Sequence, residues 1–168
     1  MEPRDGPTLL AKLLDTCNRA VLHAGEVIRA VERAREQENE RGAVDGKVVL
    51  KAVLKDENDP RTYLTIADQR AQKVILDRLR ETFPKLNIIG EEDDSESTDA
   101  LDGWTPQQDP DTLGEEYVIS VETIRNCKLY EEVELSDVTV FVDPVDGTRE
   151  FVEQRLLSCQ TLVGISWR

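Results

Sequence analysis

Apolar residues recur at helical spacing in two long stretches of the chain. From about residue 8 to residue 37, and again from 66 to 83, they fall at steps of three and four, which is typical of an amphipathic helix. The polar stretch 36–42 is expected to end the first helix, and Pro84 the second, because proline cannot continue a helix. The apolar positions are Leu10, Leu13, Leu14, Cys17, Val21, Ala24, Ile28 and Val31, then Ala67, Ala71, Val74, Ile75 and Leu79.

Shorter apolar runs, rich in β-branched residues, predict strands between turns. Composition also predicts two turns, and residues 117–127 are ambiguous between a strand and a short helix. The predicted strands cover residues 47–54, 86–89, 138–142 and 161–167, and the turns cover 55–61 and 143–148. The pattern predicts an α+β fold, with two long helices packed on one face of a mainly antiparallel sheet.

Charge is distributed unevenly along the 168 residues, whose formal net charge is −14. Residues 91–116 contain eleven Asp and Glu and no Lys or Arg, and the rest of the chain has 24 acidic against 21 basic residues. We expect this segment to form an acidic loop within a single domain. An acidic chain is a poor partner for a nucleic acid polymer. A small phosphorylated substrate stays possible, since a bound cation reverses the sign of a local site.

Cysteine usage and hydropathy predict the compartment. Cys17, Cys127 and Cys159 form no CxxC pair, which favours reduced thiols over a disulfide framework. The N-terminus has no apolar core of a secretory signal, and no run approaches the ~18–20 apolar residues of a membrane span. We therefore expect a soluble, cytoplasmic chain that does not interact with membranes.

Residues 143–151 carry the strongest chemical signal. Asp143 and Asp146 flank the Val145 carbonyl directly after an apolar strand, and an all-oxygen set of this kind suits Mg²⁺. Gly147 would let a ligand approach the backbone, and Thr148 could open a helix whose N–H groups face a phosphate. The competing interpretation is an ordinary hairpin turn built on Asp-Gly.

Two further clusters are weaker when taken alone. Residues 89–94 place acidic side chains after a predicted strand, although a solvated acidic turn has the same composition. Residues 65–68 place a threonine and an aspartate at the start of the second helix, which is the pattern of a capping box. Neither pattern by itself favours catalysis. Together with residues 143–151, however, they give a carboxylate at a helix start, then carboxylates after a strand, then a carboxylate, a turn and a hydroxyl after a buried strand.

In that order the clusters resemble a known family. Residues 83–93 (FPKLNIIGEED) and 141–151 (FVDPVDGTREF) are similar to the magnesium-dependent, lithium-sensitive inositol monophosphatase superfamily. Within it, both strings are most similar to the 3′(2′),5′-bisphosphate nucleotidases. The resemblance covers roughly residues 9–167 and implies a layered α/β sandwich of the inositol monophosphatase and fructose-1,6-bisphosphatase type.

The resemblance also implies residue roles and a reaction. Glu91, Asp143, Asp146 and the Val145 carbonyl would hold two or three Mg²⁺ ions. Asp68 would orient or deprotonate an attacking water, and Thr148 would hydrogen-bond that water, with its hydroxyl polarised by Asp68. The backbone amides of Gly147 and Thr148 would bind the scissile phosphate. The implied activity is hydrolysis of the 3′(2′)-phosphate of adenosine 3′,5′-bisphosphate or its sulfated relative, with no covalent nucleophile.

One departure from the family leaves other interpretations open. Family chains are nearly twice as long and carry a further metal-binding aspartate in a Trp-Asp motif, whereas neither Trp104 nor Trp167 precedes an aspartate. Residues 1–168 are therefore interpreted as an incomplete N-terminal, metal-binding domain, expected to expose an apolar sheet face and a strand edge and to be marginally stable. The alternatives are an inositol phosphate phosphatase and an inactive remnant or interaction module. A calcium-binding loop protein is weaker, since residues 91–116 lack EF-hand spacing.

Overall fold

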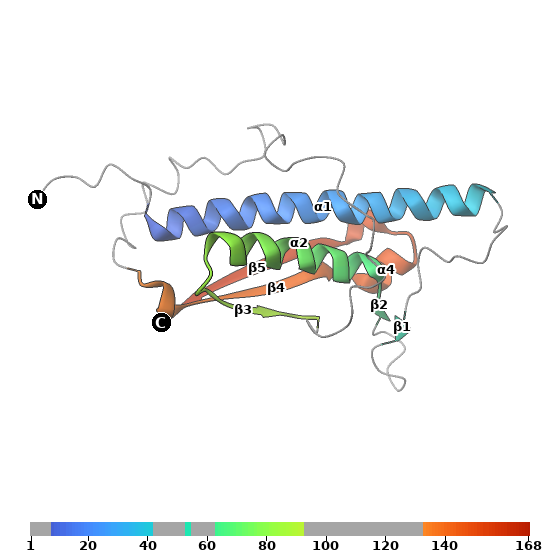
Figure 1. The fold of residues 1–168 in the computed structure, drawn as a ribbon. Helices are drawn as coiled ribbons and strands as arrows, with labels where there is room; N and C mark the ends of the chain where they lie inside the picture. Colours follow the sequence, from blue (N-terminus) through green and yellow to red (C-terminus); the bar gives the residue numbers. More distant parts are fainter. Residues whose placement is uncertain (1–7, 42–52, 55–62, 93–132) are drawn as a thin grey trace, which may run out of the picture.

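The computed structural model describes residues 8–41, 53–54, 63–92 and 133–168. Two helices and a three-stranded sheet make up most of this part of the chain (Figure 1). The elements, in chain order, are α1 (Leu9–Arg41), β1 (Val53–Leu54), β2 (Tyr63–Leu64), α2 (Ile66–Thr82), β3 (Asn87–Gly90), the 3-10 turn η5 (Leu135–Asp137), β4 (Val138–Asp146), α4 (Thr148–Val152), the 3-10 turn η6 (Leu156–Ser158) and β5 (Gln160–Trp167).

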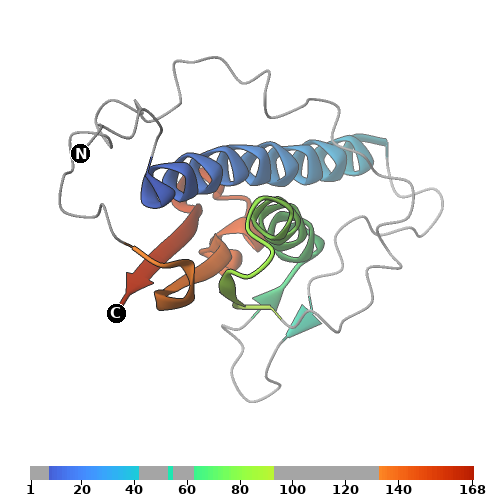
Figure 2. The ribbon, with the colours of Figure 1, turned by 60° about the vertical axis from the view of Figure 1, so that its left-hand side comes forward.

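Helices α1 and α2 lie side by side and cover one face of the sheet (Figures 1 and 2). The predicted α+β fold with two long helices on one sheet face is therefore confirmed. Helix α1 ends at Arg41, within the polar stretch 36–42 as expected, although four residues beyond the boundary near residue 37. The reason is that Glu, Gln and Arg have high helix propensity, so loss of the apolar stripe does not end the helix.

The sheet has the strand order β3-β4-β5 and is mixed. Strand β3 pairs with β4 in parallel, with Ile89 opposite Phe141, while β4 and β5 are antiparallel. The strand pattern predicted a mainly antiparallel sheet, and the longer β4–β5 ladder agrees with it, whereas the parallel β3–β4 pair was not predicted. A parallel pair needs a long crossover, and the 47 residues between Gly90 and Val138 supply the length. The short strands β1 and β2 form a separate antiparallel pair.

The core fills the space between the helices and the covered face of the sheet. From Val138 to Val142, strand β4 contributes every second residue to it, as the alternation of side chains in a strand requires. On α1 the buried stripe is rotated slightly from the predicted one, since Leu10, Leu14 and Val21 are only half-buried. Buried members include Leu13, Cys17, Ala20, Ala24, Ile28 and Val31 of α1, Ala67, Ala71, Ile75, Leu76 and Leu79 of α2, and Val138, Val140, Val142 and Val145 of β4.

The opposite face of the sheet is open in the described part of the chain. Ile89, Phe141 and Leu162 project from three adjacent strands and are 43–48% exposed. Strand β5 forms the edge of this sheet, pairing with β4 alone among the described strands. Both features were expected from the sequence. No helix of the described residues combines the length and apolar character needed to cross a membrane.

Several predictions lie outside the described residues. These are most of the strand 47–54, the turn 55–61, the acidic segment beyond Glu92, the ambiguous stretch 117–127, and Cys127. Cys17 and Cys159 are described, and both are free thiols, as predicted. The strand predicted at 86–89 is observed one residue later, and the strands predicted at 138–142 and 161–167 extend to Asp146 and back to Gln160.

Candidate active site

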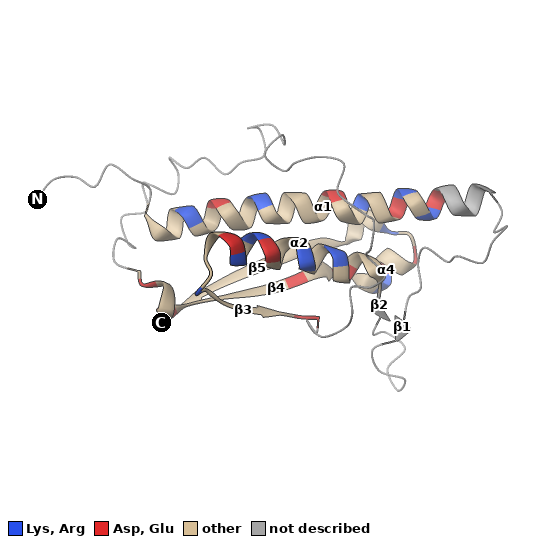
Figure 3. Cartoon of the chain, viewed as in Figure 1, with Lys and Arg blue, Asp and Glu red and all other residues tan. Residues whose placement is uncertain are grey.

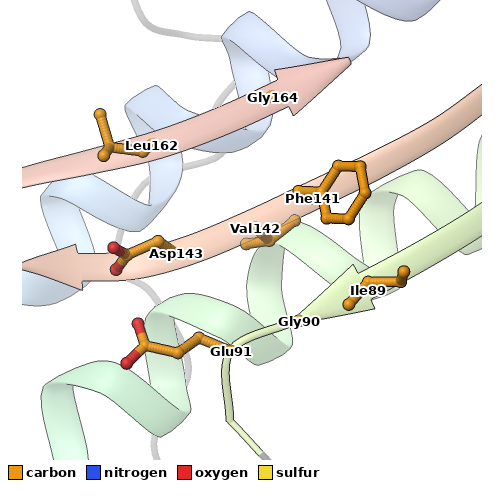
Figure 4. A pocket seen from close by; sticks show the side chains of 8 residues that line it. All are labelled: Ile89, Gly90, Glu91, Phe141, Val142, Asp143, Leu162 and Gly164. Atoms are coloured by element: carbon orange, nitrogen blue, oxygen red, sulfur yellow. The ribbon is translucent and has the colours of Figure 1, made fainter. Parts of the chain in front are cut away.

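Glu91 and Asp143 lie next to each other at the carboxyl ends of two parallel strands. The Glu91 N–H donates to the Val142 carbonyl at 2.9 Å, which continues the β3–β4 ladder one residue beyond β3. Side chains alternate along a strand, so Glu91 falls on the same face as Ile89, and Asp143 on the same face as Phe141. This is the open face, and Figure 4 shows both carboxylates at one end of it.

The two carboxylates line a shallow hollow of about 270 Å³. Apart from Glu91 and Asp143, its side chains are apolar, and the residues that line it are Ile89, Gly90, Glu91, Phe141, Val142, Asp143, Leu162 and Gly164 (Figure 4). In Figure 3 acidic residues likewise mark the end of β3 and the later part of β4. The hollow thus has an acidic end and an apolar floor.

Beyond Asp143 the chain leaves the regular ladder and turns into a short helix. The β4–β5 register shifts between Asp143 and Asp146, as in a β-bulge, and Pro144 lies within the shift. Gly147 then adopts a left-handed conformation with φ of 90°, and a Cβ there would lie 3.0 Å from the Ser158 carbonyl oxygen. The glycine is needed for both reasons. The predicted helix begins at Thr148 as α4, but it has only five residues.

Thr148 joins this turn to helix α2. Its hydroxyl Oγ1 lies 3.0 Å from Oδ1 of Asp68 and 2.9 Å from the Val145 carbonyl oxygen. A hydroxyl has one hydrogen, so Thr148 donates to one of these acceptors at a time and keeps lone pairs for another donor. The predicted Asp68–Thr148 pairing across 80 positions of sequence is therefore present in the structure.

Asp68 is also the capping-box residue that the local pattern indicated. Its Oδ2 accepts the backbone N–H of Thr65 at 2.8 Å and the Thr65 hydroxyl at 2.5 Å, and Thr65 caps α2. Asp68 is 1% exposed. Asp68 can therefore cap the helix and bind Thr148 at the same time, because Oδ2 accepts from Thr65 and Oδ1 faces Thr148.

Asp146 has a different environment from Asp143. It does not line the hollow, and its Oδ2 accepts a hydrogen bond from Gln160 Nε2 of the facing strand at 2.7 Å. The candidate residues therefore form two groups, Glu91 with Asp143 and Asp68 with Thr148, linked by the segment from Asp143 to Thr148. Asp146 and the Val145 carbonyl lie within that link.

Helix α1 anchors the end of α4. Arg35 donates from Nη1 to the Phe151 carbonyl at 3.1 Å, and its guanidinium stacks 5.3 Å from the Phe151 ring centroid. Glu32 pairs with Arg35, and both side chains are 11% exposed. A cation at the last carbonyls of a helix is favourable. No pattern in the sequence indicates this contact, because the two residues lie more than a hundred positions apart.

The thiol of Cys159 lies in a region of negative charge, which affects its pKa. Sγ donates to the Gly147 carbonyl at 3.4 Å. Burial raises the pKa of this thiol, and the nearby carboxylates of Glu150, Asp68, Glu32 and Asp146 raise it further. A thiol kept protonated is a poor nucleophile. Cys159 is therefore kept in the form that reacts poorly as a nucleophile.

Gln72 is a buried polar residue that no pattern in the sequence indicated. It lies on α2, is 4% exposed, and its amide bonds both backbone groups of Glu92. A glutamine within a helix carries no sequence signal of such a role, because helical glutamines are usually solvated. The only available signal is its position, one turn after Asp68 on the same helix face.

The acidic end of the hollow has a donor set compatible with Mg²⁺. Within residues 8–41, 53–54, 63–92 and 133–168, no three carboxylate, imidazole or thiol side chains gather as a ready-made metal cluster. Mg²⁺ does not require one, since it typically takes one or two carboxylates and completes its shell with water and substrate phosphate. The carboxylates of Glu91 and Asp143 on one hollow satisfy that requirement, so the residues fit the ion.

Comparison with solved structures identifies the fold. The crystal structure of the extragenic suppressor protein SuhB from Bartonella henselae matches 93% of this chain and 41% of its own, with a TM-score of 0.53 and 19% sequence identity. Residues 9–166 match the model of the inositol monophosphatase family. The chain belongs to the inositol monophosphatase family.

Two curated relatives show how much of a family member is present. Human 3′(2′),5′-bisphosphate nucleotidase 1 is 37% identical over 105 residues, which cover 61% of this chain and 30% of the relative. A Drosophila melanogaster protein named provisionally as inositol monophosphatase 3 is 32% identical over 158 residues, which cover 94% of this chain and 38% of the relative. The chain therefore spans about a third of the length of these relatives.

Proposed function

We propose that this chain carries the metal-binding and water-activating part of a Mg²⁺-dependent phosphomonoesterase that removes the 3′(2′)-phosphate of adenosine 3′,5′-bisphosphate. The observation that carries the proposal is the Glu91–Asp143 pair on one hollow, beside the Asp68–Thr148 hydrogen bond. The human relative named as a bisphosphate nucleotidase supports this substrate class.

Mg²⁺ would be held by Glu91 and Asp143, with Asp146 and the Val145 carbonyl as further oxygen ligands. When bound, the ion supplies charge neutralisation of the phosphate and a lower pKa for a coordinated water. The Val145 carbonyl has a second lone pair, so its hydrogen bond with Thr148 does not prevent this role. Asp146 keeps one carboxylate oxygen that Gln160 does not bond in the structure.

Asp68 and Thr148 would hold the attacking water. With its hydrogen directed to Asp68 Oδ1, the Thr148 hydroxyl can accept a hydrogen bond from water and orient its lone pair toward phosphorus. The capping box and burial fix the Asp68 carboxylate in one orientation, so it meets Thr148 without reorganisation. The amides of Gly147 and Thr148 would bind phosphate oxygens.

The test is phosphate release from adenosine 3′,5′-bisphosphate by this chain, with and without Mg²⁺. We expect turnover that EDTA abolishes and that Asp143→Asn and Thr148→Ala each reduce by about 10²-fold or more, the usual effect of losing a positioned catalytic group. Glu153→Gln serves as a matched control, because that carboxylate is exposed just after the end of α4 and paired with Arg149. Activity that survives EDTA would contradict the proposal.

An inositol phosphate substrate is the second candidate, favoured by the Drosophila relative and by the family name. Parallel assays with inositol 1-phosphate and adenosine 3′,5′-bisphosphate separate the two, since the metal site is common to both. A folded chain that turns over neither substrate would indicate the third candidate, a non-catalytic remnant or interaction module.

A further inference from the structure

We propose that Gln72 is a positioning residue that holds Glu91 in place to bind a divalent cation. The inference rests on the proposed function, because it concerns the alignment of the Glu91–Asp143 pair. Gln72 has no atom on the hollow, so it would act only through the backbone on either side of Glu91.

The amide of Gln72 binds the chain directly after Glu91. Its Nε2 donates to the Glu92 carbonyl at 2.7 Å, and its Oε1 accepts the Glu92 N–H at 2.9 Å. These two bonds reproduce the pairing that a neighbouring strand would supply, at a point where strand β3 has already ended. The Gln72 amide therefore holds the backbone in place beyond Glu91, after the strand pairing of β3 has ended.

Gly90 provides the space for this contact on the other side of Glu91. A Cβ at position 90 would lie 2.5 Å from Oε1 of Gln72 and 2.7 Å from its Cδ, closer than carbon atoms approach in proteins. The Glu91 N–H is itself bonded to Val142. Three consecutive residues are thus fixed, by packing at Gly90, by the β4 ladder at Glu91 and by the amide at Glu92.

Helix α2 then aligns both groups of the candidate site. Asp68 and Gln72 are four residues apart, so they lie on one face of the helix. Asp68 contacts Thr148 at the start of α4, while Gln72 contacts Glu92 just beyond the end of β3. Partners of metal ligands that sit outside the coordination shell typically contribute ~10–100-fold to metal affinity.

The experiment is a Mn²⁺ titration of this chain followed by the electron paramagnetic resonance signal of the free ion. We expect Gln72→Met, which keeps the volume but loses both hydrogen bonds, to weaken Mn²⁺ binding by about tenfold or more. Gln72→Glu keeps the acceptor for the Glu92 N–H and loses the donor, so its affinity should be intermediate. In metal-free protein, Gln72→Met should also speed hydrogen exchange of the Glu92 amide.

Two controls separate positioning from general destabilisation. Ile75→Val lies on the same helix in the core and should lower the melting temperature without changing Mn²⁺ affinity. Gly90→Ala should weaken Mn²⁺ binding in the native background and much less beside Gln72→Ala, because the smaller side chain removes the clash. Equal loss of affinity in Ile75→Val, or additive effects in the double variant, would overturn the inference.

A Mn²⁺ titration of the double variant Glu91→Gln/Asp143→Asn shows how much of the binding is due to all other acidic residues, including those of 93–116. If it binds Mn²⁺ as tightly as the native chain, the proposed metal site is wrong and the role of Gln72 is wrong with it. If it loses the tight site while Gln72→Met retains it, the proposed metal site stands and the inference about Gln72 alone is wrong.

Discussion

The two faces of the sheet differ in burial, although the same strands supply both. On the face under α1 and α2, Val138, Val140 and Val142 are at most 3% exposed. On the other face, Ile89 and Phe141 are 45–48% exposed, and the acidic pair follows them directly. The alternation of a β-strand thus puts core side chains on one face of the sheet and solvent-facing side chains on the other. Substitutions on the covered face should change unfolding, and those on the open face should change binding.

The largest effect is expected on the covered face, at Leu79 of α2. This side chain is fully buried, and Leu79→Ala would remove its contacts and leave a cavity. We expect a loss of about 2–5 kcal/mol in the free energy of unfolding, measured by urea denaturation with circular dichroism. A loss below about 1 kcal/mol would mean that the helices do not pack on the sheet as described.

Acidic residues on the two sides of the sheet should also differ. Asp68→Asn replaces a buried acceptor of three hydrogen bonds with an amide that cannot accept them all, at a cost of about 1–3 kcal/mol. Glu91→Gln alters an exposed side chain and should change stability by less than about 0.5 kcal/mol. Urea denaturation of both variants measures the difference, and equal losses would remove the distinction between the faces.

A matched pair of threonine substitutions sharpens the comparison. Val140→Thr buries a hydroxyl under the helices and should cost about 1–3 kcal/mol, whereas Ile89→Thr should cost less than about 0.5 kcal/mol. Ile89→Thr should also reduce self-association in sedimentation velocity, because exposed apolar patches promote it. A chain that is monomeric at high concentration without this substitution would contradict the expected liability of the open face.

Most of the helices and strands could be predicted from the sequence because their burial is periodic. The strand that each one pairs with could not be predicted, because a run such as 86–89 is compatible with a parallel or an antiparallel neighbour. Asp143 stood out because it directly follows an apolar strand, and Asp68 because it fits a capping box at the start of the second helix. The Asp68–Thr148 pair followed from the family resemblance. Gln72 escaped notice because its partner is backbone, which leaves no pattern in the side chains.

The smallest effect concerns the reactivity of a thiol on the covered side. Burial raises the pKa of Cys17 to about 12. A raised pKa favours the protonated thiol, so at pH 8 the reactive thiolate is a fraction on the order of 10⁻⁴. In a Cys127→Ser background, we expect iodoacetamide at pH 8 to modify Cys159 first and Cys17 only after urea is added, as measured by peptide mass spectrometry. Rapid modification of Cys17 in the native chain would show that α1 separates readily from the sheet, and the covered face would then not be the stable side of the molecule.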